Sequence, residues 1–226
     1  MPEKIKVEIL RDLTAVSPLD TDVAYAGIAK INDQLPENPF EVTRDTREIL
    51  IKNVERLPLR LEKINWPSQL TADYSIILTD KDIYSDNPFV RTHGATLQQA
   101  TRNRINGVAV IDVRSVEPEL TAAHELGHLM GMVYSIGNKT EHHCSSPDCL
   151  MYAHPISEEI RQHVPKKGIE GMLERAGFIN PEYLYSERNL AQSFCTPCEK
   201  QLARRAFMTL QYLNGESNSP KSWSYN

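Results

Sequence analysis

Two histidines and a glutamate lie within five residues of each other in the segment HELGH, which begins at His124. In a helix, residues four positions apart lie on the same face, so His124 and His128 would direct both imidazoles to one point. Two imidazoles at this spacing suit a zinc ion. Glu125 is placed to reach a water bound to the metal rather than the metal itself, which is the position of a general base for hydrolysis.

The residues around this motif indicate that its helix is buried. Ala122, Ala123, Leu126 and Leu129 are all apolar. The alternative is a solvated surface helix that carries the motif by chance. Two histidines and a glutamate are costly to bury without a compensating charge, and a divalent cation supplies that charge. We therefore expect a functional zinc site.

A third protein ligand is expected, because catalytic zinc usually has three. Gly131 extends the motif to HExxHxxG, in which the glycine lets the chain leave the helix sharply and bring a third histidine to the metal. In the usual spacing that ligand is residue 134, which here is Tyr134. Tyrosine is a poor neutral ligand because a phenol keeps its proton at neutral pH. The other candidates are His142, His143 and, further along, His154.

A longer pattern follows the two histidines of the helix. A histidine, four cysteines and a methionine form the segments H-C-x4-C-x-M and C-x2-C: His143, Cys144, Cys149, Met151, Cys195 and Cys198. Together with HExxHxxG, and in this order, these segments resemble the signature of the archaemetzincins, a family of zinc metallopeptidases in the metzincin clan. The sequence departs from that signature in two places, the loop before His143 and the spacer before Cys195, which are both longer.

The resemblance implies that His143 is the third ligand of the catalytic zinc, with His142 as its rival. It implies that Met151 packs beneath the ligating imidazoles. The implied fold is α/β: a small twisted mixed β-sheet with backing helices and an active-site helix, followed by a mainly helical C-terminal part. The resemblance also implies an edge strand that holds a peptide by main-chain pairing. Residues 90–97 are our candidate for that strand.

The composition of the 226-residue chain is that of an ordinary globular protein, with 40% hydrophobic and 24% charged residues. A net charge of −5, with no cluster of Lys and Arg on one predicted face, argues against nucleic-acid binding. The first residues, MPEKIKVEILRDL, lack the apolar run of a signal peptide, and no segment has the roughly 18 apolar residues of a membrane span. We expect a cytoplasmic monomer that does not bind membranes.

The four cysteines predict a second metal site. Cys144, Cys149, Cys195 and Cys198 are all the cysteines of the chain and form two pairs with short internal spacings. Such pairs suit a tetrahedral structural zinc. Disulfides and unpaired thiols are the alternatives, and disulfides are rare in the cytoplasm. We expect two zinc ions, one catalytic and one structural, and the structural ion would also hold His143, which directly precedes Cys144.

The hydrophobic pattern predicts a mixed N-terminal part and a helical C-terminal part. Strands are predicted at 5–10, 40–43, 74–78, 90–97 and 107–113. Helices are predicted at about 21–35, 45–57, 118–136, 157–163, 168–175, 181–189 and 196–213. We expect one metzincin-like catalytic domain, with an upper subdomain at 1–131, a helical lower subdomain at 132–213 and a polar tail at 214–226.

The predicted function is a zinc-dependent metallopeptidase that hydrolyses a peptide or protein substrate through a zinc-bound water activated by Glu125. One alternative is a catalytically silent zinc-binding module of the same fold, which Tyr134 and the longer loop support. Another is a zinc hydrolase of non-peptide substrates. The presence of Glu125 favours an enzyme, because a purely structural metal site does not need a base.

Overall fold

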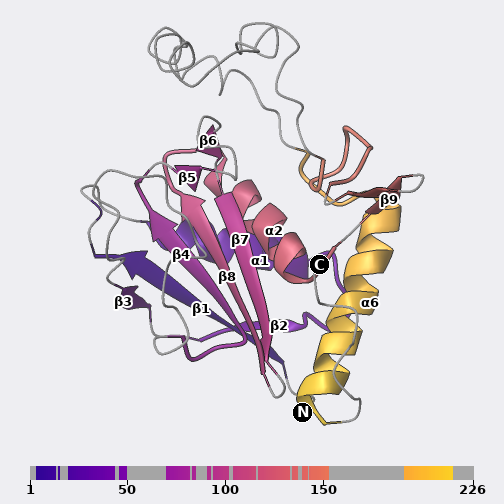
Figure 1. Cartoon of the computed structure of the whole chain (residues 1–226), viewed down its shortest axis with the longest axis horizontal. Helices are drawn as coiled ribbons and strands as arrows, with labels where there is room; N and C mark the ends of the chain where they lie inside the picture. Colours follow the sequence, from indigo (N-terminus) through magenta and orange to yellow (C-terminus); the bar gives the residue numbers. More distant parts are fainter. Residues whose placement is uncertain are drawn as a thin grey trace, which may run out of the picture.

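The computed structural model of the chain describes residues 4–13, 15, 20–43, 46–49, 70–81, 83–84, 91–92, 94–101, 104–115, 117–132, 134–136, 139–141, 143–152 and 191–215. The strands are β1 (Ile5–Asp12), β2 (Phe40–Val42), β3 (Arg47–Ile49), β4 (Tyr74–Thr79), β5 (Ile83–Tyr84), β6 (Arg91–Thr92), β7 (Gly94–Thr101), β8 (Arg104–Asp112), β9 (Tyr134–Ile136) and β10 (Lys139–Glu141). The helices are α1 (Asp22–Asn32), α2 (Pro118–Leu129) and α6 (Thr196–Leu213), labelled as in Figure 1.

Six strands form one mixed sheet in the order β2-β1-β4-β8-β7, with β3 also pairing with β1. The pairs β1·β2, β1·β3, β1·β4 and β4·β8 are parallel, and β7 pairs antiparallel with β8 at the edge. The pairs β5·β6 and β9·β10 form two smaller antiparallel sheets. The predicted α/β class with a small mixed sheet is therefore confirmed, and the predicted strand at 90–97 corresponds mainly to β7, at the sheet edge.

Successive side chains of a strand point to opposite faces of the sheet, and both faces of this sheet are apolar. β4 is buried along its whole length, which is typical of a central parallel strand covered on both sides. One face packs against α1, α2 and α6, which contribute residues such as Ile28, Leu126 and Leu202 to a single core. Ile77 and Val110 lie on the other face, in a smaller cluster. The helices of the larger core lie beside the sheet in Figure 1.

The two helices behind the sheet touch almost backbone to backbone. A Cβ atom added to Gly27 of α1 would lie 2.7 Å from the Cβ of Ala122 and 2.7 Å from the carbonyl oxygen of Glu119, both in α2. Only glycine permits this separation, because any larger side chain would push the helices apart. The close contact fixes α2, and hence its histidines, against α1.

The start of one predicted helix is wrong. Residues 47–49 of the helix predicted at 45–57 form the strand β3, which pairs with the last residues of β1. Buried Glu8 on β1 forms an ion pair with Arg47, and Ile49 packs into the smaller apolar cluster. These tertiary contacts override a local helical pattern. The remainder of that predicted helix, from residue 50, lies outside the described residues.

The C-terminal helix is confirmed with the predicted bounds, since α6 spans Thr196–Leu213. The segment before it is tied to α1, because Gln34 Oε1 accepts a hydrogen bond from the Phe194 N–H at 2.9 Å and Lys30 Nζ donates to Gln192 Oε1 at 3.0 Å. The helices predicted at 157–163, 168–175 and 181–189, and all but the first two residues of the predicted tail, lie outside the described residues.

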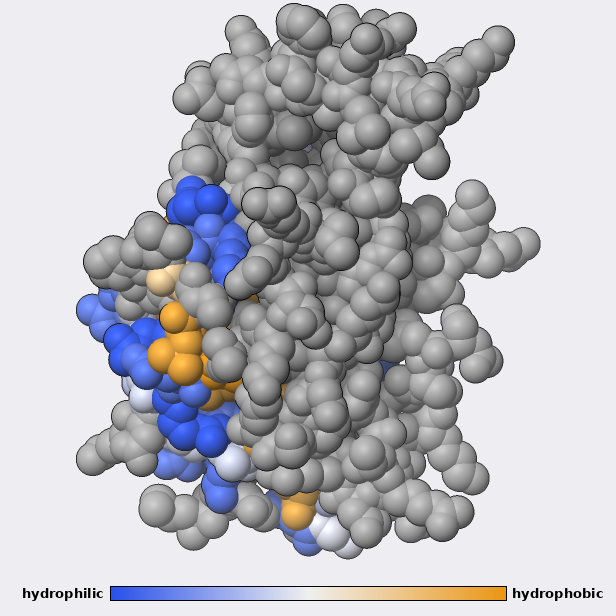
Figure 2. Space-filling view, turned by 60° about the vertical axis from the view of Figure 1, so that its left-hand side comes forward, coloured by the Kyte–Doolittle hydropathy of each residue, from blue (hydrophilic) through white to orange (hydrophobic). Residues whose placement is uncertain are grey.

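The described residues that face the viewer in Figure 2 are mostly polar. In Figure 2 hydrophilic side chains (blue) surround a smaller apolar area (orange). Leu13 and Phe207 are large hydrophobic side chains exposed among the described residues, at 52% and 60%. None of the described helices has the length and apolar character needed to cross a membrane.

Candidate metal centres

Helix α2 carries the HELGH motif and ends sooner than the sequence predicts. Pro118 occupies its first turn, where a missing N–H costs nothing. At its end, Gly131 has a φ of 70°, and the N–H groups of Gly131 and Met132 donate to the carbonyls of His128 and Gly127 at 2.8 and 3.3 Å. This is a Schellman motif, which stops a helix. The predicted extension of the helix to residue 136 is therefore wrong.

The chain after the helix forms a hairpin. Strand β9 (Tyr134–Ile136) pairs antiparallel with β10 (Lys139–Glu141), and Tyr134 lies opposite Glu141. The chain thus returns near to the point at which it left the helix. The longer loop before His143 is largely taken up by this hairpin, and the side chains of Tyr134 and His142 lie outside the described residues.

Three histidines converge where the chain returns. The ring centroids are 4.7 Å apart for His124 and His128, 4.9 Å for His128 and His143, and 5.4 Å for His124 and His143. One nitrogen from each ring lies within 4.8 Å of the others, and all three side chains are half-buried. The Nε2 atoms of His124 and His128 are 3.0 Å apart. Tetrahedral zinc with bonds of about 2.0–2.1 Å would place ligand nitrogens about 3.4 Å apart, so these rings fit one ion.

A main-chain carbonyl orients the first of these rings. The oxygen of Leu150 lies 2.7 Å from Nδ1 of His124. A carbonyl only accepts hydrogen bonds, so Nδ1 carries the proton and Nε2 keeps its lone pair toward the other two rings. A ligating histidine typically has such a partner on its second nitrogen. The sequence gives no indication of this contact, because any residue type supplies the carbonyl.

Glu125, which follows His124 on α2, is buried, with only 6% of its surface exposed. Burial raises the pKa of its carboxyl group to about 8. Gly94, the first residue of edge strand β7, covers its side chain. A Cβ at Gly94 would lie 2.6 Å from Cγ and 2.9 Å from Oε1 of Glu125. The carboxyl group thus has a defined place between the edge strand and α2.

Met151 lies under the helix turn between the two histidines of α2. It is fully buried, and a Cβ at Gly127 would lie 2.6 Å from its Sδ. The resemblance implies that this methionine packs beneath the imidazoles; the contact seen in the structure is with Gly127, which lies between the two histidines in the sequence. Gly127 is the small residue that makes room for the thioether, a role that the motif alone does not reveal.

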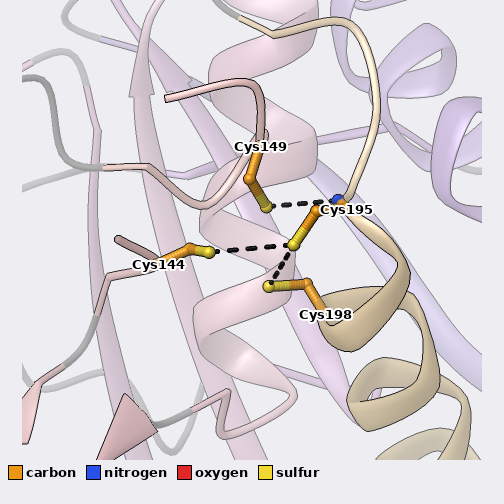
Figure 3. A group of neighbouring side chains, drawn as sticks. All are labelled: Cys144, Cys149, Cys195 and Cys198. Carbon is orange, nitrogen blue, oxygen red and sulfur yellow. Dashed lines mark hydrogen bonds between the residues drawn. The ribbon is translucent and has the colours of Figure 1, made fainter. Parts of the chain in front are cut away.

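The four cysteines form a second cluster about a common centre. Figure 3 shows their sulfurs pointing toward one another, with Cys144 and Cys149 on the loop of residues 143–152 and the other two at the start of α6. The Sγ atom of Cys195 lies 3.7 Å from that of Cys144 and 3.3 Å from that of Cys198. Zinc–sulfur bonds of about 2.3 Å in a tetrahedron would place sulfurs about 3.8 Å apart, so the donor set fits zinc.

Hydrogen bonds to sulfur favour the thiolate at one of these positions. The Cys198 thiol lowers the pKa of Cys149 to about 5; burial opposes this shift, and the N–H groups of Cys195 and Met151 add to it. Burial raises the pKa of Cys195. A metal that binds thiolates supplies the positive charge that such a buried group of sulfurs needs.

The predicted site residues therefore lie in two groups. The three predicted histidines form one, and the four cysteines form the other. The structure thus brings together every residue that the sequence analysis selected for metal binding. Leu150, Gly94 and Gly127, by contrast, enter only through the structure. Gly127 stands inside HELGH and Gly94 directly follows His93, but no spacing rule marks either glycine.

Comparison with solved structures agrees with this architecture. The chain is similar to the crystal structure of an archaemetzincin from Methanopyrus kandleri, with a TM-score of 0.52 and 15% sequence identity. The match covers 89% of this chain and 95% of that chain. The fold is archaemetzincin-like. No family model matches this sequence, and a search of curated protein sequences finds no match.

Proposed function

We propose that this protein is a zinc-dependent peptidase of the archaemetzincin type. The observation that carries the proposal is the convergence of His124, His128 and His143, with a buried glutamate, Glu125, directly following the first of them on α2. The three histidines would hold a zinc ion, and such an ion would supply Lewis-acid activation of a water molecule, which is the chemistry of hydrolysis. A closed structural site would not need a carboxyl group next to it.

Each protein group has a distinct task in this proposal. The three imidazoles hold the ion, and the Leu150 carbonyl fixes the tautomer of His124. Glu125 is next to a ligand on α2, so its carboxylate accepts a proton from the attacking water and passes it to the leaving amine. A dication nearby favours the ionised form of that carboxyl group against the effect of burial.

Edge strand β7 supplies a place for an extended peptide. It pairs with β8 on one side, and no strand among the described residues pairs with its other side. Gly94, at its start, contacts Glu125. A peptide added antiparallel or parallel to this edge would gain main-chain hydrogen bonds and pass close to the general base. The proposed substrate is accordingly a peptide or protein, and the proposed setting is the reducing cytoplasm, where the four thiols stay available for zinc.

The proposal is tested by comparing zinc content and hydrolysis of a peptide library for the wild type and E125Q. Wild type should hold two zinc ions per chain and cleave peptides. E125Q should hold both ions but lose about 10²- to 10⁴-fold in kcat, the usual contribution of a general base. E119Q, a change of the same type at the start of the same helix, should leave the rate unchanged.

Two results would contradict the proposal. Equal rates for wild type and E125Q would remove Glu125 from the reaction. A wild-type protein that holds both ions yet cleaves no peptide would support the catalytically silent module, or a hydrolase of other substrates.

A further inference from the structure

The loop of residues 143–152, here called the metal loop, carries groups that serve both clusters. At its start, His143 of the histidine cluster directly precedes Cys144 of the cysteine cluster. Near its end, Cys149 directly precedes Leu150, whose carbonyl oxygen lies 2.7 Å from Nδ1 of His124. Cys144 is therefore adjacent to a histidine of the other cluster, and Cys149 is adjacent to the residue whose carbonyl orients another of its histidines.

The metal loop is closed on itself by main-chain hydrogen bonds. The N–H of Cys144 donates to the carbonyl of Met151 at 2.8 Å, and the N–H of Tyr152 donates to the carbonyl of Cys149 at 2.8 Å. The start and end of the loop are thus one unit, and a displacement at one end is transmitted to the other. Met151, buried against Gly127, also anchors this unit under α2.

The second half of the cysteine cluster belongs to another element. Cys195 and Cys198 stand at the start of α6, which contacts the metal loop through hydrogen bonds and through a shared apolar core. The N–H of Leu150 donates to the carbonyl of Ser193 at 2.8 Å, and the N–H of Cys195 donates to Sγ of Cys149 at 3.3 Å. Four metal–thiolate bonds would be far stronger than these hydrogen bonds, so a bound ion would decide where the loop lies relative to α6.

We infer that the two sites are thermodynamically coupled: an ion at the four cysteines raises the affinity of the three histidines for theirs. The coupling acts through His143, attached to Cys144, and through the Leu150 carbonyl, attached to Cys149, which orients His124. Without the cysteine-bound ion the loop gains freedom, and the histidine site must order two of its three ligands on binding. This inference rests on the two proposed metal sites and not on peptide hydrolysis.

The size and symmetry of the effect follow from general relations. Loss of a group that orients a ligating histidine typically lowers metal affinity about 10- to 100-fold. Coupling between two binding sites is reciprocal, so an ion at the histidines must raise the affinity of the cysteines by the same factor.

The experiment uses the 226-residue chain in the E125Q background, which separates metal binding from turnover. Zinc affinity at the histidines is measured by competition with a chromophoric chelator, and cobalt reports the cysteines through its sulfur-to-metal absorption. C198S removes a ligand on α6 and leaves the metal loop unaltered. We expect it to lower zinc affinity at the histidines about tenfold or more. The control S145A, at an exposed position of the metal loop, should leave that affinity unchanged.

Two further variants test the coupling between the sites if C198S folds poorly. C198H retains four ligands and should restore the affinity of the histidine site. H128A should lower cobalt affinity at the cysteines by the factor that C198S shows for the histidines. A folded C198S protein with unchanged affinity at the histidines would overturn the coupling and leave the proposed function intact. A wild-type protein whose histidines bind no zinc would overturn both.

Discussion

Replacement of Gly94 by alanine tests the contact between the edge strand and the proposed base. The added Cβ would lie 2.6 Å from Cγ, 2.9 Å from Oε1 and 3.0 Å from Cδ of Glu125. Carbon atoms prefer separations of about 3.5–4.0 Å, so the overlap with Cγ is about 1 Å. Both residues are buried. Overpacking of this kind costs about 1–3 kcal/mol of the free energy of unfolding.

A double-mutant cycle isolates this contact. All three atoms near the added Cβ belong to the Glu125 side chain beyond its own Cβ, so E125A removes them together. In that background G94A should be neutral, or stabilising by about 0.4–1 kcal/mol because alanine restricts the unfolded chain. The interaction free energy of the pair is then about 1–4 kcal/mol. Denaturant unfolding at a fixed zinc concentration measures the four free energies.

The same substitution has a second expected result. If G94A shifts the carboxyl group of Glu125 by about 1 Å, the rate of peptide hydrolysis should fall about 10²-fold while zinc content stays the same. The reasoning is refuted if G94A destabilises the wild-type and E125A backgrounds equally, since the cost would then arise elsewhere than at Glu125.

Two further predictions concern stability. G27A should lower the free energy of unfolding by about 1–3 kcal/mol, measured by denaturant titration, because its Cβ would lie 2.7 Å from that of Ala122 and force α1 from α2; an unchanged value would show that the helices separate freely. Burial alone would raise the pKa of Glu8, but hydrogen bonds from Ser75, Thr71 and Arg47 lower it below its usual value. The ionised Glu8 carboxylate therefore contributes its full stabilisation of the fold above its unfolded pKa of about 4.3. This contribution is lost as the pH falls through the lower pKa of Glu8 in the folded state. The stability difference between wild type and E8Q should shrink over that acid range, and a constant difference would contradict this assignment.

The parts of the structure that follow from local sequence were predictable. His124, Glu125 and His128 stand on one helix, so their spacing alone fixes their relation. Strand β4 contains the apolar run Ile76–Leu78, and α6 carries a helical pattern from its first residue to its last. The archaemetzincin-like sheet and helices followed from the order of the motifs rather than from any one of them.

The parts that depend on distant contacts were not predictable. Arg47 and Ile49 lie in a strand because β1 offers pairing partners and Glu8 offers a charge, none of which a local helical pattern contains. The contact between the Leu150 carbonyl and His124 could not be predicted, because every residue has a main-chain carbonyl and no residue type marks this one. The end of α2 is a different case, because Gly131 is a strong stop signal that stands in the sequence itself.

The hairpin β9–β10 explains how a longer loop can leave the histidine site complete. In the shorter family pattern the third ligand would stand at residue 134. Here Tyr134 pairs with Glu141, and paired residues in an antiparallel ladder have Cα atoms about 4.5–5.5 Å apart. An inserted hairpin therefore returns the chain to nearly the place where it began, whatever its length. His143 stands two residues after Glu141, and its ring lies near those of His124 and His128. A histidine at position 134, three residues after Gly131, would reach the same two rings in the shorter pattern. The distance across the base of the hairpin decides how far His143 lies from the end of α2. The number of residues between them suggests a larger separation than the structure has.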